Sequence, residues 1–83
     1  MQVSVISPDS ELFSGEASSV KVPGTMGGFQ ILNNHAPIVS SLTEGTIEIK
    51  TPQETLQFNI NGGFVEVLNN QVSLLVTGAD LKV

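Results

Sequence analysis

The sequence of 83 residues contains no cysteine. Neither a disulfide nor a thiolate metal site can therefore stabilise the fold, and the absence is consistent with a reducing compartment. A chain of this length forms one small domain, which buries only about 60% of the surface that its unfolded chain exposes. We therefore expect marginal stability and a partner protein that stabilises the folded state by binding it.

Arginine is also absent, and three lysines stand against eight acidic residues, which gives a net charge of −5. Nucleic acids and anionic membrane surfaces attract basic proteins, so we expect neither as a direct partner. The apolar runs are far shorter than the ~18 residues of a membrane-spanning helix, and the start of the chain lacks the basic region of a signal peptide. The sequence predicts no direct membrane insertion, so that any membrane association would depend on another protein.

Apolar and polar residues alternate along most of the chain, most clearly in residues 46–50, 56–61 and 72–77. Alternation over such short segments is typical of strands with one buried face. Turn signals such as Glu44-Gly45 and Asn69-Asn70 separate the segments. The sequence predicts an all-β fold: an antiparallel β-sandwich of about eight to ten short strands in two sheets. We expect a single domain over residues 1–83, with strands to about residue 77 and a short tail over 78–83.

The segment of residues 20–37 has the densest turn chemistry in the chain. Pro-Gly at 23–24, Gly-Gly at 27–28 and Asn-Asn at 33–34 predict three turns around one short strand, and the last turn places His35 in a loop. Ordering three turns costs conformational entropy, so we expect these loops to serve a function.

This segment reads Val-x-x-x-Gly-x-x-Gly-x-x-x-Ile-Leu-x-x-His-Ala-Pro, which resembles the N-terminal β-sandwich domain of the epsilon subunit of F-type ATP synthases. Residues 12–17, 42–47 and 62–75 continue the resemblance in the family's order, over nearly the whole chain. The resemblance implies a non-catalytic subunit without a cofactor that binds the gamma subunit and sits on the polar loops of the membrane c-ring. Its role would be to couple c-ring rotation to gamma during ATP synthesis driven by an ion gradient.

Two further expectations follow from the resemblance. As part of F1, the subunit would be peripheral on the cytoplasmic face of the bacterial inner membrane. In the family a C-terminal helical hairpin follows the sandwich, and in some relatives it inhibits ATP hydrolysis and supports nucleotide binding. No helical pattern follows residue 77, so we expect that domain to be absent, with neither an inhibitory arm nor tight ATP binding.

The resemblance also implies partner-binding positions in the loops, but the sequence departs from the family at two of them. Gly28 stands where the family is commonly acidic, and Asn33-Asn34 replaces a frequent Pro-Gly. We therefore expect backbone or polar contacts with the ring in place of a charged contact. The expected partner-binding residues are Ser7, Gly28, Gln30, Asn34, His35 and Ser40.

Other chemistry at these loops finds little support in the sequence. No nucleophile-elbow pattern accompanies His35, and one histidine without cysteine cannot form a zinc site. The carboxylates are scattered, with no Asp-rich calcium loop, and the glycine-rich residues 24–28 lead to a strand and carry no lysine for phosphate. We expect no catalytic, cofactor or metal site. The His35 imidazole either pins the turns through backbone hydrogen bonds or contacts a partner.

Two questions remain open from the residues alone: whether the chain has a different binding function, and what the apolar residues near its end cover. A small carbohydrate- or ligand-binding β-sandwich would normally offer an aromatic platform, but Trp and Tyr are absent and the four Phe are expected in the core. Residues 64–68 and 74–76 carry apolar side chains on both faces of their strands. They indicate either a sandwich with covered edges or an outward apolar patch that docks a partner.

Overall fold

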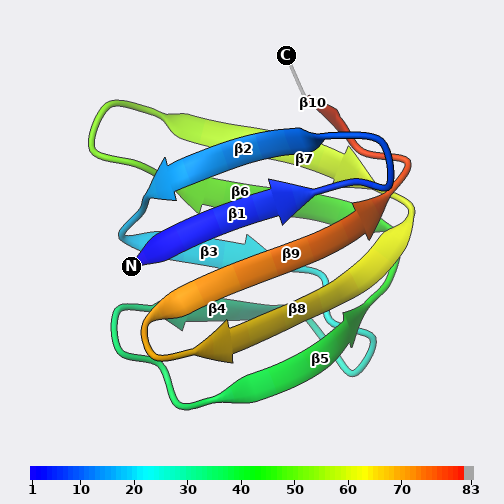
Figure 1. Cartoon of the computed structure of the whole chain (residues 1–83). Helices are drawn as coiled ribbons and strands as arrows, with labels where there is room; N and C mark the ends of the chain where they lie inside the picture. The colour runs from blue at the N-terminus through cyan, green and yellow to red at the C-terminus, as the bar shows by residue number, and fades with distance from the viewer. Residues whose placement is uncertain (82–83) are drawn as a thin grey trace.

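The computed structural model describes residues 1–81, and within them all regular secondary structure is β-strand (Figure 1). The alternation of apolar and polar residues therefore marks strands, as predicted, and the number of strands is at the upper end of the predicted range. The ten strands are β1 (Gln2–Ile6), β2 (Glu11–Glu16), β3 (Ser19–Val22), β4 (Phe29–Leu32), β5 (Ile38–Leu42), β6 (Gly45–Lys50), β7 (Thr55–Ile60), β8 (Gly62–Leu68), β9 (Gln71–Thr77) and β10 (Asp80–Leu81).

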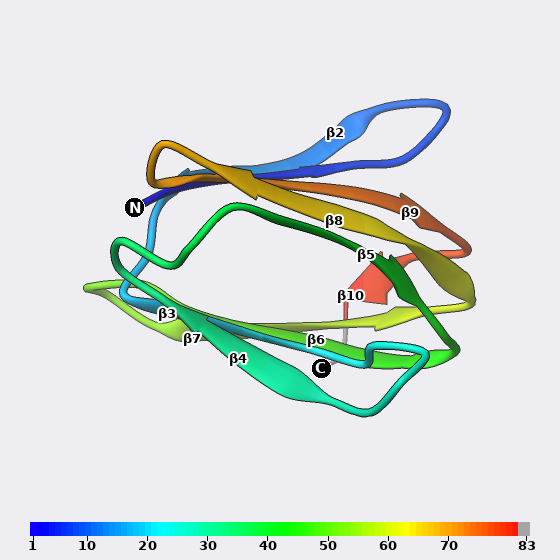
Figure 2. The same ribbon diagram turned by 90° about the horizontal axis from the view of Figure 1, so that it is seen from below.

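The strands form two five-stranded sheets, which lie face to face as the two layers seen in Figure 2. The first sheet has the order β2-β1-β9-β8-β5 and the second has the order β10-β7-β6-β3-β4. The predicted β-sandwich is confirmed. Strands β4 and β5 are consecutive in the chain but belong to different sheets, where each is an edge strand. Both line the same flank of the sandwich (Figures 1 and 2).

One pair of strands departs from the antiparallel pattern. Strand β1 runs parallel to β9, with Ile6 opposite Leu75, while the other neighbouring pairs in both sheets are antiparallel. A tight hairpin forces its two strands to be antiparallel, but β1 and β9 are joined by no hairpin, so their direction is set by the sheet. This pair places the beginning of the chain inside the first sheet, between β2 and the central strand β9.

The core lies between the sheets and consists of the inward-facing residues of the alternating segments. Val3, Val65 and Leu74 from the first sheet and Ile31 and Ile47 from the second are fully buried. Among the described residues no polar or charged residue is buried, and no buried side-chain nitrogen or oxygen lacks a hydrogen-bond partner. The core is thus a dry layer of mostly β-branched side chains, which pack well on pleated surfaces.

The expectation that all four phenylalanines lie in the core is wrong for Phe64, which is 57% exposed. Phe58 is buried, and Phe13 and Phe29 are partly buried against the core. In β8 the neighbouring Val65 faces inward, and successive side chains of a strand point to opposite faces. Phe64 must therefore face outward.

The expectation that strands end near residue 77 is also wrong. Asp80 and Leu81 form β10, which pairs antiparallel with β7 at the edge of the second sheet. Gly78, with a φ of 63°, supplies the left-handed turn that brings the chain across to it. The last two residues of the expected tail, 82–83, lie outside the described residues.

Candidate functional site

The loops of the sandwich gather at its two ends. At one end, here called the Ser7 end, lie residues 7–10, 23–28 and 43–44, where the backbone nitrogen of Thr43 donates to the carbonyl oxygen of Pro23 at 2.8 Å. At the other, here called the His35 end, lie residues 33–37 and 69–70, where the backbone nitrogen of Asn34 donates to Oδ1 of Asn70 at 2.8 Å. Figure 2 shows the two sets of loops at opposite ends of the two layers.

The structure does not bring the six expected partner-binding residues into one cluster. Ser7 and Gly28 lie at the Ser7 end, and Asn34 and His35 lie at the His35 end. The other two expected residues lie on the edge strands: Gln30 is exposed on β4, and Ser40 is half-buried on β5, where its hydroxyl donates to the carbonyl oxygen of Ser41 at 3.2 Å. Apart from Ser7, these residues follow the flank formed by β4, β5 and their loops.

His35 lies in the predicted loop and is half-buried. Its Nδ1 lies 2.7 Å from the carbonyl oxygen of Ala36, to which it donates a hydrogen bond, and its backbone nitrogen donates to the carbonyl oxygen of Leu32 at 3.2 Å. The preceding Asn34 has a φ of 63°, the left-handed conformation that Asn tolerates. A neutral imidazole that donates through Nδ1 has Nε2 left as an acceptor, so this ring can pin the turn and accept a hydrogen bond from a partner.

An open hollow of about 400 Å³ lies beside His35. Its lining consists of uncharged polar and small apolar residues, namely Asn34, His35, Ala36, Pro37, Asn69 and Asn70. The hollow suits neutral polar contacts, such as hydrogen bonds with main-chain or amide groups of a partner.

The outer face of the first sheet carries an apolar stripe of three side chains, Ile6, Leu75 and Phe64, on the adjacent strands β1, β9 and β8. They stand in register, with Leu75 opposite both Ile6 and Phe64. Leu75 is 53% exposed, and Phe64 is 57% exposed. Of the two interpretations of residues 64–68 and 74–76, the structure thus supports an outward apolar patch.

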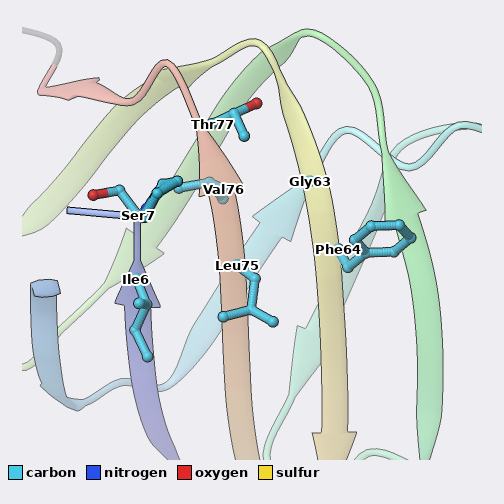
Figure 3. A pocket seen from close by; sticks show the side chains of 8 residues that line it. Ile6, Ser7, Gly63, Phe64, Leu75, Val76 and Thr77 are labelled. Carbon is cyan, nitrogen blue, oxygen red and sulfur yellow. The ribbon is translucent and has the colours of Figure 1, made fainter. Parts of the chain in front are cut away.

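An open groove of about 390 Å³ runs along the apolar stripe towards the Ser7 end (Figure 3). Besides the stripe, its lining consists of Ser7, Pro8, Gly63, Val76 and Thr77. Ser7 is thus the one expected partner-binding residue that borders the groove. A groove with an apolar floor and few polar groups is the kind of surface that accepts apolar side chains of a partner protein.

The flank formed by β4 and β5 is uncharged. From Val22 to Thr43 the sequence contains no Asp, Glu, Lys or Arg, although such residues occur on both sides of this segment. Charged side chains on edge strands commonly prevent unwanted pairing with other strands, and the edge strands β4 and β5 both lack them. Sequence reasoning missed this signal, which a plot of charge along the chain would have revealed.

Within the described residues no group of three or more His, Asp or Glu side chains is arranged to hold a metal ion. None of residues 1–81 belongs to a helix of the length and hydropathy that a membrane crossing requires.

Residues 1–82 match the family model of the β-sandwich domain of the ATP synthase delta/epsilon chain. The chain belongs to this family. Membership confirms the resemblance carried by the turns of residues 20–37 and by the collinear segments around them.

Named relatives in the family include the ATP synthase epsilon chain of Leptospira borgpetersenii, which is 45% identical over 82 residues, covering 99% of this chain and 65% of the relative. The ATP synthase epsilon chain of Caulobacter vibrioides is 39% identical, with 95% of this chain and 92% of the relative covered. The chain thus spans just under two thirds of the length of the Leptospira relatives and nearly all of the Caulobacter relative.

Two solved structures share the fold. A chain of the mitochondrial ATP synthase of Euglena gracilis, in a structure of OSCP, F1 and c-ring, superposes with a TM-score of 0.88 at 21% identity, covering 95% of this chain and 51% of that chain. A chain from the central stalk and c-ring of the Tetrahymena thermophila mitochondrial enzyme gives 0.83 at 19% identity, covering 95% and 64%. At these identities the likeness shows that the family's sandwich architecture is present here.

Proposed function

We propose that this chain is a non-catalytic rotor subunit of an ATP synthase, which joins the gamma subunit to the membrane c-ring and makes them turn together. The apolar stripe of Ile6, Leu75 and Phe64 is the observation that carries the proposal. Contiguous exposed apolar side chains often mark the site where a partner binds, and permanent interfaces are the more apolar ones. We assign the stripe and the groove beside it to gamma.

The uncharged flank is assigned to the c-ring. The polar loops of the ring need hydrogen-bonding partners, and the flank offers Gln30, Asn34 and His35 together with the backbone at Gly28. The half-buried Ser40 lies on the same flank, on β5. Because Gly28 replaces a commonly acidic residue, the contact depends on shape and neutral hydrogen bonds.

The sandwich transmits torque because it is stiff. Its core is close-packed, and a packed interior deforms little under load. The stripe lies on a sheet face and the flank lies at the sheet edges, so two partners can be held at once by one rigid body. The names of the relatives, ATP synthase epsilon chains, support this assignment. As part of F1 the chain would lie on the cytoplasmic face of the bacterial inner membrane, held there through its partners.

The alternative function, carbohydrate binding, gains no support from the structure. Sugar-binding surfaces use aromatic platforms, and Phe64 is the one strongly exposed aromatic residue among those described. It stands within an aliphatic stripe, without the polar groups that would orient a sugar.

Assembly tests the proposal directly. We expect the tagged chain, added to gamma and to detergent-solubilised c-ring from the same organism, to elute with both in size-exclusion chromatography. Gamma and ring without the chain give the baseline. Failure of the chain to join either partner, or retention of glycans in place of ATP synthase subunits, would refute the proposed function.

A further inference from the structure

Met26 is the most exposed large apolar residue among those described, at 99%, and it forms the tip of the loop of residues 23–28 between β3 and β4. The other methionine, Met1, is 6% exposed and belongs to the core. A single exposed apolar side chain is ordinary on a protein surface. The loop that carries Met26 is not ordinary, for two independent reasons.

First, the loop is braced. The backbone nitrogen of Thr25 donates to the carbonyl oxygen of Ser41 at 3.0 Å, and the hydroxyls of these two residues lie 2.7 Å apart. The backbone nitrogen of Gly27 donates to the carbonyl oxygen of Gly24 at 3.0 Å, and Gly24 forms a bridge with Leu42. Thr25 and Gly24 thus tie the loop to the end of β5, and the bond from Gly27 to Gly24 closes the turn that carries Met26. A partner that binds a loop held in this way loses little conformational entropy in ordering it.

Second, the loop can make no ionic contact of its own. It lies within the uncharged segment from Val22 to Thr43, whose nearest charged neighbours in the sequence are Lys21 and Glu44. The family resemblance places a charged contact with the ring at Gly28, two residues from Met26. In this chain that contact must come from something other than charge.

We infer that Met26 is an apolar anchor that inserts between the loops of adjacent subunits of the c-ring. The inference rests on the proposed function, which assigns this flank to the ring. A ring of identical subunits repeats the same crevice between neighbours around its circumference, and an unbranched thioether side chain adapts to crevices of irregular shape. The braced loop then holds the side chain in place at the end of the flank, beside Gly28.

The test measures binding of the chain, already in complex with gamma, to immobilised c-ring by biolayer interferometry. Removing a side chain that becomes buried in the complex should weaken binding by about tenfold or more, so we expect that loss for Met26→Ala. Met26→Leu keeps the apolar volume and should bind within about twofold of the parent chain. Leu81→Ala, which removes an exposed apolar side chain from β10, is the matched control and should bind as the parent does. Because the contact carries no charge, raising salt from about 50 to 500 mM should weaken it little.

The outcomes separate this inference from the proposed function. If the parent chain joins gamma but shows no affinity for the ring, the assignment of the flank is at fault. If the parent binds the ring and Met26→Ala binds equally well, Met26 is not an anchor. Loss of gamma binding in Met26→Ala, with ring binding kept, would show that gamma covers the loop and would overturn the inference. A steep loss of ring binding with salt would also overturn it.

Discussion

Leu75→Asp is expected to abolish binding to the gamma subunit while leaving the sandwich folded. Leu75 stands at the centre of the apolar stripe, between Ile6 and Phe64, and is 53% exposed in the isolated chain. A carboxylate there would have to lose its water on docking without gaining a partner. Central interface positions commonly dominate affinity, so we expect a loss on the order of 100-fold or more, measured by titration calorimetry with purified gamma.

The chain offers a matched control for this variant. Leu81 is 57% exposed, but it lies on β10 at the edge of the second sheet. Leu81→Asp adds the same charge and should bind gamma about as well as the parent does. Circular dichroism should show the β spectrum of the parent for both variants. Equal loss of affinity in both would mean that net charge matters and the stripe does not, and gamma binding by Leu75→Asp at parental strength would refute the stripe as the docking surface.

Three glycines have a positive φ, namely Gly27, Gly63 and Gly78. Of their replacements by alanine, Gly63→Ala is expected to destabilise the fold most. Gly63 has a φ of 147° and is the second residue of β8, beside β9, where a Cβ would overlap the carbonyl oxygen of Leu75. The new methyl group would meet backbone, which cannot rotate away, so β8 and β9 must separate locally. We expect a loss of about 3 kcal/mol or more in the free energy of unfolding, a large share of the ~5–10 kcal/mol expected for a small domain.

Gly27→Ala is the control that isolates the steric term. Gly27 also has a positive φ, of 123°, but a Cβ there would meet nothing within 4 Å. Only conformational strain should then appear, at about 1–2 kcal/mol. Urea titrations of both variants beside the parent measure the difference. If the free energy of unfolding falls by the same amount in both variants, the close approach of the Leu75 carbonyl oxygen does not explain the glycine at residue 63.

Alternation predicted the strands well because each strand buries one face, and a two-residue period is visible in the sequence without knowledge of partners. The two residues of β10 show no such period, since their pairing with Asn59 and Phe58 of β7 depends on the finished sheet. The direction of Phe64 was mispredicted for a related reason. Val65 beside it is also apolar, and only the pairing with Ser41 and Leu75 shows which of the two faces the core.

The candidate site was predicted less completely than the fold. The turns of residues 20–37 marked the loops, and the left-handed Asn34 and the loop position of His35 agree with that reading. Which loops share an end depends on topology, in particular on the parallel pairing of β1 with β9, and no local pattern in the sequence encodes it. The uncharged segment and its one methionine are visible in the sequence, but the exposure of Met26 and the place of the segment at the sheet edges become clear only in the fold.

The most direct test of the central claim is ATP-driven ion pumping by vesicles that contain the source organism's ATP synthase, prepared without its epsilon subunit and then supplied with this chain. A rotor coupler should restore the number of ions pumped for each ATP hydrolysed, and Leu75→Asp should fail to restore it. We predict recovery of coupled pumping with the parent chain and no recovery with the variant. Binding of the parent chain to the enzyme, with pumping still uncoupled from hydrolysis, would contradict the account.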